Sequence, residues 1–300
     1  MRLAVVVVLA TGCRFNFFES DPPRMDVGTS MTDADTNIEL GPWGTPVLMT
    51  DVSLQVEPDD DPTLTADELE IYFDSGRVVT GGAGGDVWMA TRASTADPFN
   101  TPTNVTELLS GSDDSTGDLS ADGLRLYLSS DRRVTGDRDL YVSSRADRQS
   151  AWGTLVRIAE LSATSQNDAG ACESSDGLSL IFGSERSGNG DLFVTTRVST
   201  GAPWSLPQLV PGINTAEEES QHWCNGELTL IYFSRRNATS GDLDIFYASR
   251  ANPSVPFDPA RRVDELTTSG DDADPWVSSD LRTMYFSRGA TGGDIFISKR

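Results

Sequence analysis

From residue 43 onward, hydrophobic and polar positions alternate in short runs that recur along the chain. Alternation with aromatic and β-branched residues is typical of strands that are buried on one face, and no segment shows the 3.6-residue period of a helix. We therefore expect an all-β protein with little helix. The recurring runs are residues 69–73 (LEIYF), 124–128 (LRLYL), 178–182 (LSLIF), 228–233 (LTLIYF) and 281–286 (LRTMYF).

A second segment in each repeat begins with aspartate, continues with an apolar and an aromatic residue, and reaches arginine six positions after the aspartate. The starting aspartates are 53, 52, 53 and 50 residues apart, which is the spacing of a repeat architecture. Another short strand, opened by an aromatic residue, separates successive copies. The segments are residues 86–92, 139–145, 191–197, 244–250 and 294–300, and the separating aromatics are Trp43, Phe99, Trp152, Trp204 and Phe257.

Four short strands in each repeat predict the blade of a β-propeller. Residues 43–300 hold five such units, with one spare strand at residues 43–50 and one strand missing from the last unit. We therefore predict a five-bladed β-propeller whose ring is closed by the N-terminal strand pairing with the C-terminal blade. The alternative is a six-bladed ring, which needs a blade from residues 14–42, a segment without strand patterning.

Several stretches carry a more specific resemblance. Residues 118–124 (DLSADGL), 128–132 (LSSDR) and 274–278 (DPWVS) resemble the PD40, or WD40-like, repeat of TolB-type propellers. The resemblance covers nearly all of residues 43–300. It implies a propeller fold, and its members include bacterial envelope proteins that bind partners and propellers fused to hydrolases. A shared fold does not define a function, so the function has to come from the site.

The first 13 residues have the order of an export signal: Arg2, an apolar run over residues 3–10, and small residues before Cys13. This segment resembles a bacterial lipoprotein signal, in which Cys13 is lipidated and becomes the mature N-terminus. The alternative is a plain secretory signal. Residues 14–42 are rich in acidic and small residues and predict a flexible tether. We expect an exported, membrane-anchored lipoprotein at the periplasmic or outer-membrane face of the bacterial envelope.

The charge excludes several classes of partner. The chain of 300 residues carries 46 Asp plus Glu against 23 Lys plus Arg, a net charge of −23. Such a chain repels polyanions, so we expect no nucleic-acid binding and no adhesion to an anionic membrane except through the lipid anchor. We expect a monomer whose partner is an envelope protein or a glycan.

Motifs for catalysis or cofactors are missing. His222 is the only histidine and Lys299 the only lysine. Multi-histidine metal sites, most catalytic triads and phosphate-binding loops that need a lysine are therefore excluded. We expect no cofactor, apart from weak Ca²⁺ binding at acidic residues.

One acidic position recurs once in each repeat, eight residues before the acid of the following turn. A ring of five carboxylates around one channel mouth would form a cation or ligand patch, because it attracts cations and repels anions. The alternative is a set of solvated loop acids that cap strand ends. The five residues are Asp59, Asp114, Asp168, Glu219 and Asp272.

In the middle of the strands that we expect to be innermost, some residues differ from those at the equivalent positions of the other repeats. Adjacent blades can stack in two ways. In one of them, Cys172 faces Cys224 and Asp118 faces Glu173. If Cys13 is lipidated, the two other cysteines form an even pair in an oxidising compartment, which predicts a disulfide. The alternative is two buried free thiols.

Two departures bear on function. Asp118 and Glu173 together form an acid pair, which suggests a glycan-active hydrolase with paired carboxylates. His222 and Trp223 could form a ligand patch at the channel mouth, or they could be a polar rim residue beside a core tryptophan. We favour a non-catalytic binding or scaffold propeller of the bacterial cell envelope, with the glycan-active hydrolase as the alternative.

Overall fold

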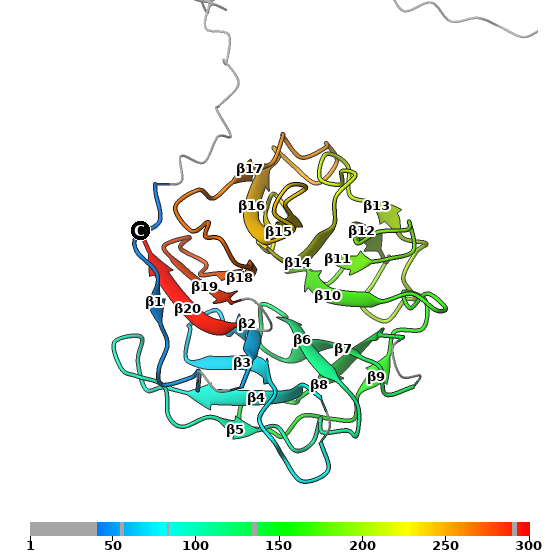
Figure 1. Ribbon diagram of the computed structural model, residues 1–300. Coiled ribbons are helices and arrows are strands. Elements are labelled where there is room, and N and C mark those ends of the chain that lie inside the picture. Colours follow the sequence, from blue (N-terminus) through cyan, green and yellow to red (C-terminus); the bar gives the residue numbers. More distant parts are fainter. Residues whose placement is uncertain (1–40, 55–56, 83, 134–136, 290–292) are drawn as a thin grey trace, which may run out of the picture. The chain divides into compact units, whose positions relative to one another are not determined.

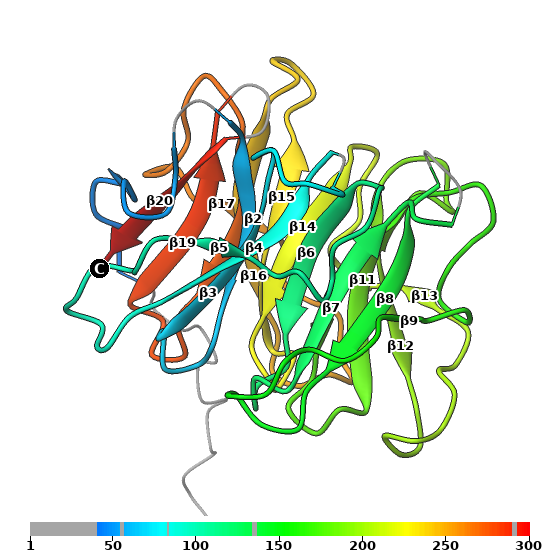
Figure 2. The ribbon, with the colours of Figure 1, turned by 90° about the horizontal axis from the view of Figure 1, so that it is seen from below.

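The computed structural model describes residues 41–54, 57–82, 84–133, 137–289 and 293–300. Within them the chain forms five four-stranded antiparallel sheets arranged around a central axis, with β2, β6, β10, β14 and β18 innermost (Figures 1 and 2). The predicted all-β, five-bladed propeller is therefore confirmed, and the described residues contain no helix. Consequently no described helix is long and apolar enough to cross a membrane.

The first four blades each use consecutive strands. Blade 1 comprises β2 (Asp59–Leu64), β3 (Glu70–Ser75), β4 (Asp86–Thr91) and β5 (Thr103–Asn104). Blade 2 comprises β6 (Asp114–Leu119), β7 (Arg125–Ser130), β8 (Asp139–Ser144) and β9 (Val156–Arg157). Blade 3 comprises β10 (Asp168–Glu173), β11 (Ser179–Ser184), β12 (Asp191–Thr196) and β13 (Gln208–Leu209). Blade 4 comprises β14 (Glu219–Cys224), β15 (Leu230–Arg236), β16 (Leu243–Ser249) and β17 (Arg261–Arg262).

The fifth blade combines both ends of the described chain. It comprises β18 (Asp272–Val277), β19 (Thr283–Arg288), β20 (Asp294–Lys299) and, as its outermost strand, β1 (Val47–Leu48). β1 runs antiparallel to β20, with Val47 opposite Ile297. The amide of Gly44 also donates a hydrogen bond to the carbonyl of Lys299, over 2.8 Å. The first and last parts of the propeller thus share one sheet.

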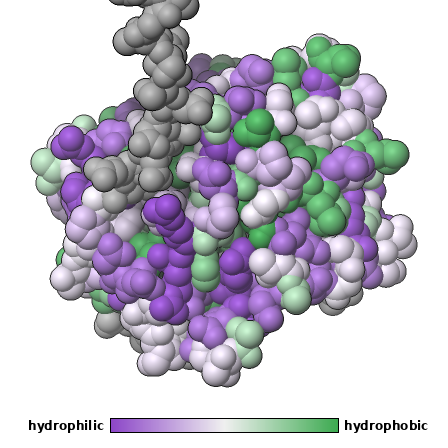
Figure 3. Space-filling model, turned by 90° about the horizontal axis from the view of Figure 1, so that it is seen from above, coloured by the Kyte–Doolittle hydropathy of each residue, from purple (hydrophilic) through white to green (hydrophobic). Residues whose placement is uncertain are grey.

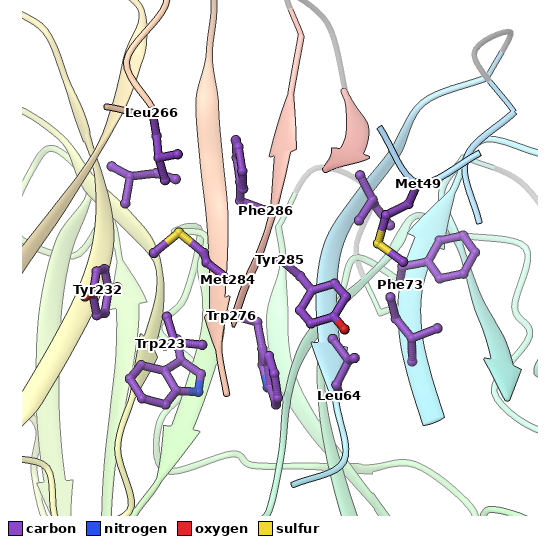
Figure 4. Close-up of a cluster of buried hydrophobic side chains, with 14 of the residues drawn as sticks. Met49, Leu64, Phe73, Trp223, Tyr232, Leu266, Trp276, Met284, Tyr285 and Phe286 are labelled. Carbon is purple, nitrogen blue, oxygen red and sulfur yellow. The ribbon is translucent and has the colours of Figure 1, made fainter. Parts of the chain in front are cut away.

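The second strand of each blade is buried on both faces because neighbouring blades pack against it. In blade 1, every residue of β3 is buried. The largest hydrophobic cluster runs through blades 4, 5 and 1 and includes Trp223, Trp276 and Phe73 (Figure 4). On the surface, hydrophilic side chains cover much of the face in Figure 3, as expected of an acidic chain.

The arginine that ends each repeat has a structural role. Its guanidinium lies 4.1 to 4.5 Å from the centre of an aromatic ring, and its Nε donates to a carbonyl in the turn before the second strand of the same blade. Stacking on an aromatic face stabilises a cation, and the hydrogen bond fixes the turn. These contacts explain why both residue types recur. The pairs are Arg92 with Phe99, Arg145 with Trp152, Arg197 with Trp204, Arg250 with Phe257, and Arg300 with Trp43.

Candidate functional site: the central channel

The five repeated acids lie at the first position of the innermost strands, and each side chain is at most 1% exposed. Each carboxylate pairs with an arginine at or just after the end of the neighbouring second strand, at nitrogen-to-oxygen distances of 2.5 to 3.0 Å. The pairs are Asp59 with Arg77, Asp114 with Arg132, Asp168 with Arg186, Glu219 with Arg235, and Asp272 with Arg288.

These carboxylates also accept hydrogen bonds from the loop that leads into the strand. Glu219, for example, accepts from the amide and hydroxyl of Thr215, over 2.9 and 2.6 Å. Burial raises the pKa of Asp59, Asp168 and Asp272, and the paired arginines oppose this rise. The geometry is thus neither an open ring of carboxylates nor a set of solvated loop acids, because each charge is neutralised inside its own blade. A cation or ligand patch at these positions stays a prediction.

The axis of the propeller holds a cavity of about 110 Å³. Every innermost strand has a register shift in its middle, and a bulge of this kind turns a side chain away from the regular pleat. Asp61 and Asp274 have backbone φ angles of 48° and 53°, a left-handed conformation that costs free energy for residues other than glycine. Both side chains line the cavity.

A cluster of carboxyl groups surrounds Asp61 and Asp274. The two side chains lie close enough that the charge of Asp274 adds to the rise in the pKa of Asp61 that burial causes, and Asp274 accepts a hydrogen bond from the hydroxyl of Ser287. Burial raises the pKa of Asp61 and of neighbouring Asp74 well above the usual range, and repulsion between the carboxylates adds to the effect. These buried carboxyl groups are therefore harder to ionise than exposed aspartates.

Arg138 is the positive charge that acts on this acid cluster. It lines the same cavity and lowers the pKa values of Asp60 and Asp61, although burial keeps the pKa of Asp60 raised to about 6. Our sequence analysis missed this group. The signal available was the shared position of Asp61 and Asp274, each directly before a proline in its repeat.

Asp118 and Glu173 both border a second, wider cavity of about 320 Å³ at the turn end of the innermost strands. Burial raises the pKa of Asp118 to about 7, and the charge of Glu173 contributes, so the structure brings the two within electrostatic reach. Glu173, however, pairs with Arg125 and Arg197, each at 2.8 Å. Glu173 is thus already paired with two cations, whereas the described hydrogen-bond donors to Asp118 are neutral, such as the Thr63 hydroxyl at 2.8 Å.

His222 lies inside the channel, only 8% exposed, where its ring borders the axial cavity next to Gly170. One ring nitrogen, Nε2, is 3.1 Å from the carbonyl of Ile181, and Nδ1 has no hydrogen-bond partner among the residues that the structure describes. Trp223 is also buried and packs against Tyr232. The two residues border the channel from within, and a ligand patch there stays a prediction.

The burial of His222 predicts a dependence of stability on pH. Burial lowers its pKa from 6.5 to about 4, so the unfolded chain takes up a proton in this range before the folded protein does. The stabilisation is complete above pH 6.5 and is lost as pH falls towards 4, by about 3 kcal/mol in total. We expect urea denaturation of the wild type and a His222→Gln variant to show this difference. A constant difference between the two proteins from pH 7 to 4 would contradict it.

A disulfide joins Cys172 on β10 to Cys224 on β14, with Cα atoms 6.0 Å apart. It links the innermost strands of blades 3 and 4, the place where the sequence positions the two cysteines opposite each other. The other predicted features at the N-terminus, namely the signal, lipidation of Cys13 and all but the last two residues of the tether, lie outside the described residues. Within the described part of the chain, no group of three His, Cys, Asp or Glu residues is arranged to hold a metal ion.

These features define a five-bladed β-propeller with a narrow acidic channel. No family model and no curated protein matches the chain. Among solved structures it is similar to TolB from Acinetobacter baumannii, with a TM-score of 0.51 and 15% identity over 81% of this chain, which spans about half (54%) of that protein.

The fold is equally similar to sugar-active enzymes. An α-L-arabinofuranosidase from Podospora anserina matches with a TM-score of 0.56 and 12% identity, covering 86% of this chain and 96% of that one. A thermostable family-43 glycoside hydrolase matches with a TM-score of 0.55 and 15% identity, covering 84% and 91%. At these identities the similarity concerns the fold alone. A TolB-like propeller fold is therefore shown, while PD40 repeats and a lipoprotein remain predictions.

Proposed function

We propose that this protein is a non-catalytic binding propeller of the bacterial envelope, anchored through a lipid on Cys13, that engages a protein or glycan partner at the turn-end mouth of its channel. The observation that carries the proposal is the pairing of Glu173 with two arginines. A hydrolase with paired carboxylates needs a second free carboxyl group beside Asp118, and Glu173 is already neutralised.

The acids in the axial cavity do not supply a better catalytic pair. Asp61 and Asp274 both line this cavity, and burial raises the pKa of each carboxyl group. The cavity of about 110 Å³ around them is also smaller than ordinary ligand pockets, which measure roughly 300 to 1,000 Å³.

The turn-end mouth is the better binding surface. Its cavity of about 320 Å³ lies at the lower end of the range for ligand pockets, and its walls combine apolar residues such as Leu119 and Val277 with the carboxyl group of Asp118. Residues from all five blades border it, including the exposed Ala66, Ala121 and Ser279. A partner that inserts one side chain or one sugar into this cavity contacts residues of all five blades.

Affinity capture from envelope extracts, combined with a glycan panel, tests the proposal. In one variant, Ala121→Arg and Ser279→Arg fill the mouth; in the matched control, Val198→Arg and Leu206→Arg alter exposed positions on blade 3 outside the mouth. We expect the wild type and the control to retain the same partner and the mouth variant to lose it, with no sugar released from the panel. Equal retention by the mouth variant argues against the proposed surface.

The hydrolase alternative has its own outcome. Sugar release by the wild type that is abolished by Asp118→Asn would overturn the non-catalytic assignment. Asp118→Asn is the appropriate variant because its hydrogen-bond partners are neutral. Glu173→Gln would instead leave Arg125 and Arg197 without a counter-ion. A loss of activity in that variant could then result from destabilisation of the fold and not from loss of a catalytic group.

A further inference from the structure

In three blades, the closing arginine also takes part in a polar cluster at the junction with the preceding blade. At the junction of blades 5 and 1, Arg92 Nη2 donates to the hydroxyl of Tyr285 over 2.9 Å. That hydroxyl donates to Glu68 Oε2, also over 2.9 Å, and the arginine lies 3.5 Å from the same oxygen. The cluster thus consists of an arginine, a tyrosine of the preceding blade and a glutamate.

Two more junctions have the same composition. Between blades 1 and 2, Arg145 contacts the hydroxyl of Tyr72 at 3.1 Å and Glu70 at 2.9 Å. Between blades 2 and 3, Arg197 pairs with Glu173 at 2.8 Å, and burial together with the nearby charge of Glu173 raises the pKa of Tyr127. The glutamate comes from a different position each time, but a carboxylate is present in all three.

The junction of blades 4 and 5 keeps the tyrosine and the arginine but lacks the carboxylate. Tyr232 is 0% exposed, and among the described residues neither its hydroxyl nor Arg300 Nη2 makes a hydrogen bond of ordinary geometry. Burial raises the pKa of Tyr232 to about 12, and Arg300 and Trp43 are close enough to its hydroxyl to oppose this rise. The Tyr232 hydroxyl therefore has a cation beside it but lacks the carboxylate acceptor of the other junctions. A ligand that supplies this acceptor binds favourably, because a buried donor without an acceptor is costly.

The aligned repeats explain the missing carboxylate. The positions that supply glutamate at the other three junctions are all apolar here: Leu281 corresponds to Glu68, Leu230 to Glu70, and Val277 to Glu173. The junction of blades 3 and 4 is different, because it has lost the tyrosine as well, with Ile181 in its place. Only the junction of blades 4 and 5, among those described, therefore has a donor pair that lacks its acceptor.

A cavity of about 440 Å³ adjoins this donor pair. Its walls carry the rings of Trp43, Tyr232 and Tyr247, with the last two centred 5.6 Å apart. Arg261 and Arg262 also line it; Arg262 pairs with Asp264 at 2.7 Å, and Glu265 is a further acid at the wall. The cavity thus combines aromatic surface with Tyr232 and Arg300, whose hydroxyl and Nη2 are buried and make no ordinary hydrogen bond among the described residues.

We propose that this cavity binds a small carboxylate whose carboxyl group takes the place of the missing glutamate between Tyr232 and Arg300. The aromatic walls favour a ligand in which the carboxylate is attached to a flat ring, since ring faces pack well against aromatic side chains. This site lies at the junction of blades 4 and 5, and the two cavities share no lining residue; Leu281 borders only the turn-end mouth of the proposed function.

Ligand-observed ¹⁹F NMR with 4-fluorobenzoate tests the site, with 4-fluorobenzamide as a neutral probe of the same shape. We expect the wild type to broaden the benzoate signal and to leave the amide signal nearly unchanged. Tyr232→Phe removes one donor and keeps the ring, and it should weaken benzoate binding about tenfold. Equal broadening of both probes, or broadening of neither, overturns the proposal.

Leu281→Glu is the most informative variant. Leu281 has a backbone φ of 60°, close to the 57° of Glu68, so the new carboxylate enters from the same position as in the complete cluster. We expect it to reach Arg300 and Tyr232, to abolish benzoate binding and to leave the thermal midpoint equal or higher. Undiminished benzoate binding in this folded variant overturns the proposal.

Glu39 requires a separate control because it stands two residues before Gly41, which borders the cavity. Glu39→Gln removes the nearest acid that precedes the cavity in the sequence. We expect this variant to bind 4-fluorobenzoate as the wild type does. Binding that appears only in Glu39→Gln would show that the chain fills the site with its own carboxylate, and it would overturn the assignment of an external ligand.

Discussion

Replacing Trp43 with alanine is expected to lower the free energy of unfolding by about 3 to 5 kcal/mol, the range for removing a large aromatic side chain from a core. Trp43 is 6% exposed and packs edge-on against Tyr232, with ring centres 6.4 Å apart. The guanidinium of Arg300 lies over the face of the Trp43 ring, 4.1 Å from the ring centre. Trp43 also precedes β1, the two-residue strand that completes the last blade. Its loss therefore removes core packing and weakens the closure of the ring.

Urea denaturation gives the size of this effect, and hydrogen exchange of the amides in β19 and β20 gives its location. The matched control is Trp204→Ala, because Trp204 stacks under Arg197 at the same distance of 4.1 Å but in blade 3, whose strands are consecutive in the chain. We expect faster exchange in β20 only for the Trp43 variant. Faster exchange of β20 in both variants, or in neither, would mean that Trp43 does not hold the ring closed.

Loss of the disulfide is the second large effect that we expect. Cys172 and Cys224 are 52 residues apart, and a cross-link over that length restricts the unfolded chain enough to stabilise the fold by about 4 kcal/mol. The double variant Cys172→Ala and Cys224→Ala should unfold at a correspondingly lower urea concentration. Both cysteines are buried, so alanine at each position creates little new exposed surface.

Reductant provides the control for the disulfide prediction. Dithiothreitol should lower the urea midpoint of the wild type towards that of the double variant and should leave the double variant unchanged. The reaction should be slow under native conditions because both sulfur atoms lie in the core. If the wild type and the double variant unfold at the same midpoint without reductant, the bond contributes no stability.

Much of the fold could be predicted from the sequence, because the structural information is repeated. Five copies of the same alternation and the same aspartate-to-arginine spacing define five blades. The spare strand at the start and the missing strand at the end predict a shared last blade, and β1 does pair with β20. Alignment of neighbouring inner strands also predicts that Cys172 lies opposite Cys224, and a disulfide joins them.

The chemistry of the channel could be predicted only in part. Comparison of the repeats placed Asp118 near Glu173, and these residues do interact. It did not reveal that Arg125 and Arg197 converge on Glu173 from two different blades. Nor did it reveal the bulges at Asp61 and Asp274, which both line the axial cavity, since a bulge depends on backbone geometry that alternation does not encode.

The strands, the blades and the number of units thus follow from the repeated residues alone, because periodic burial requires periodic apolar residues. The role of each polar residue becomes visible only when the blades are packed together. The recurrent acids are buried partners of arginines, and Tyr232 and Arg300 lack the carboxylate that their counterparts have. The physical reason is that the state of a charge depends on its burial and on its nearest opposite charge, and those neighbours come from other blades or from strands distant in the chain.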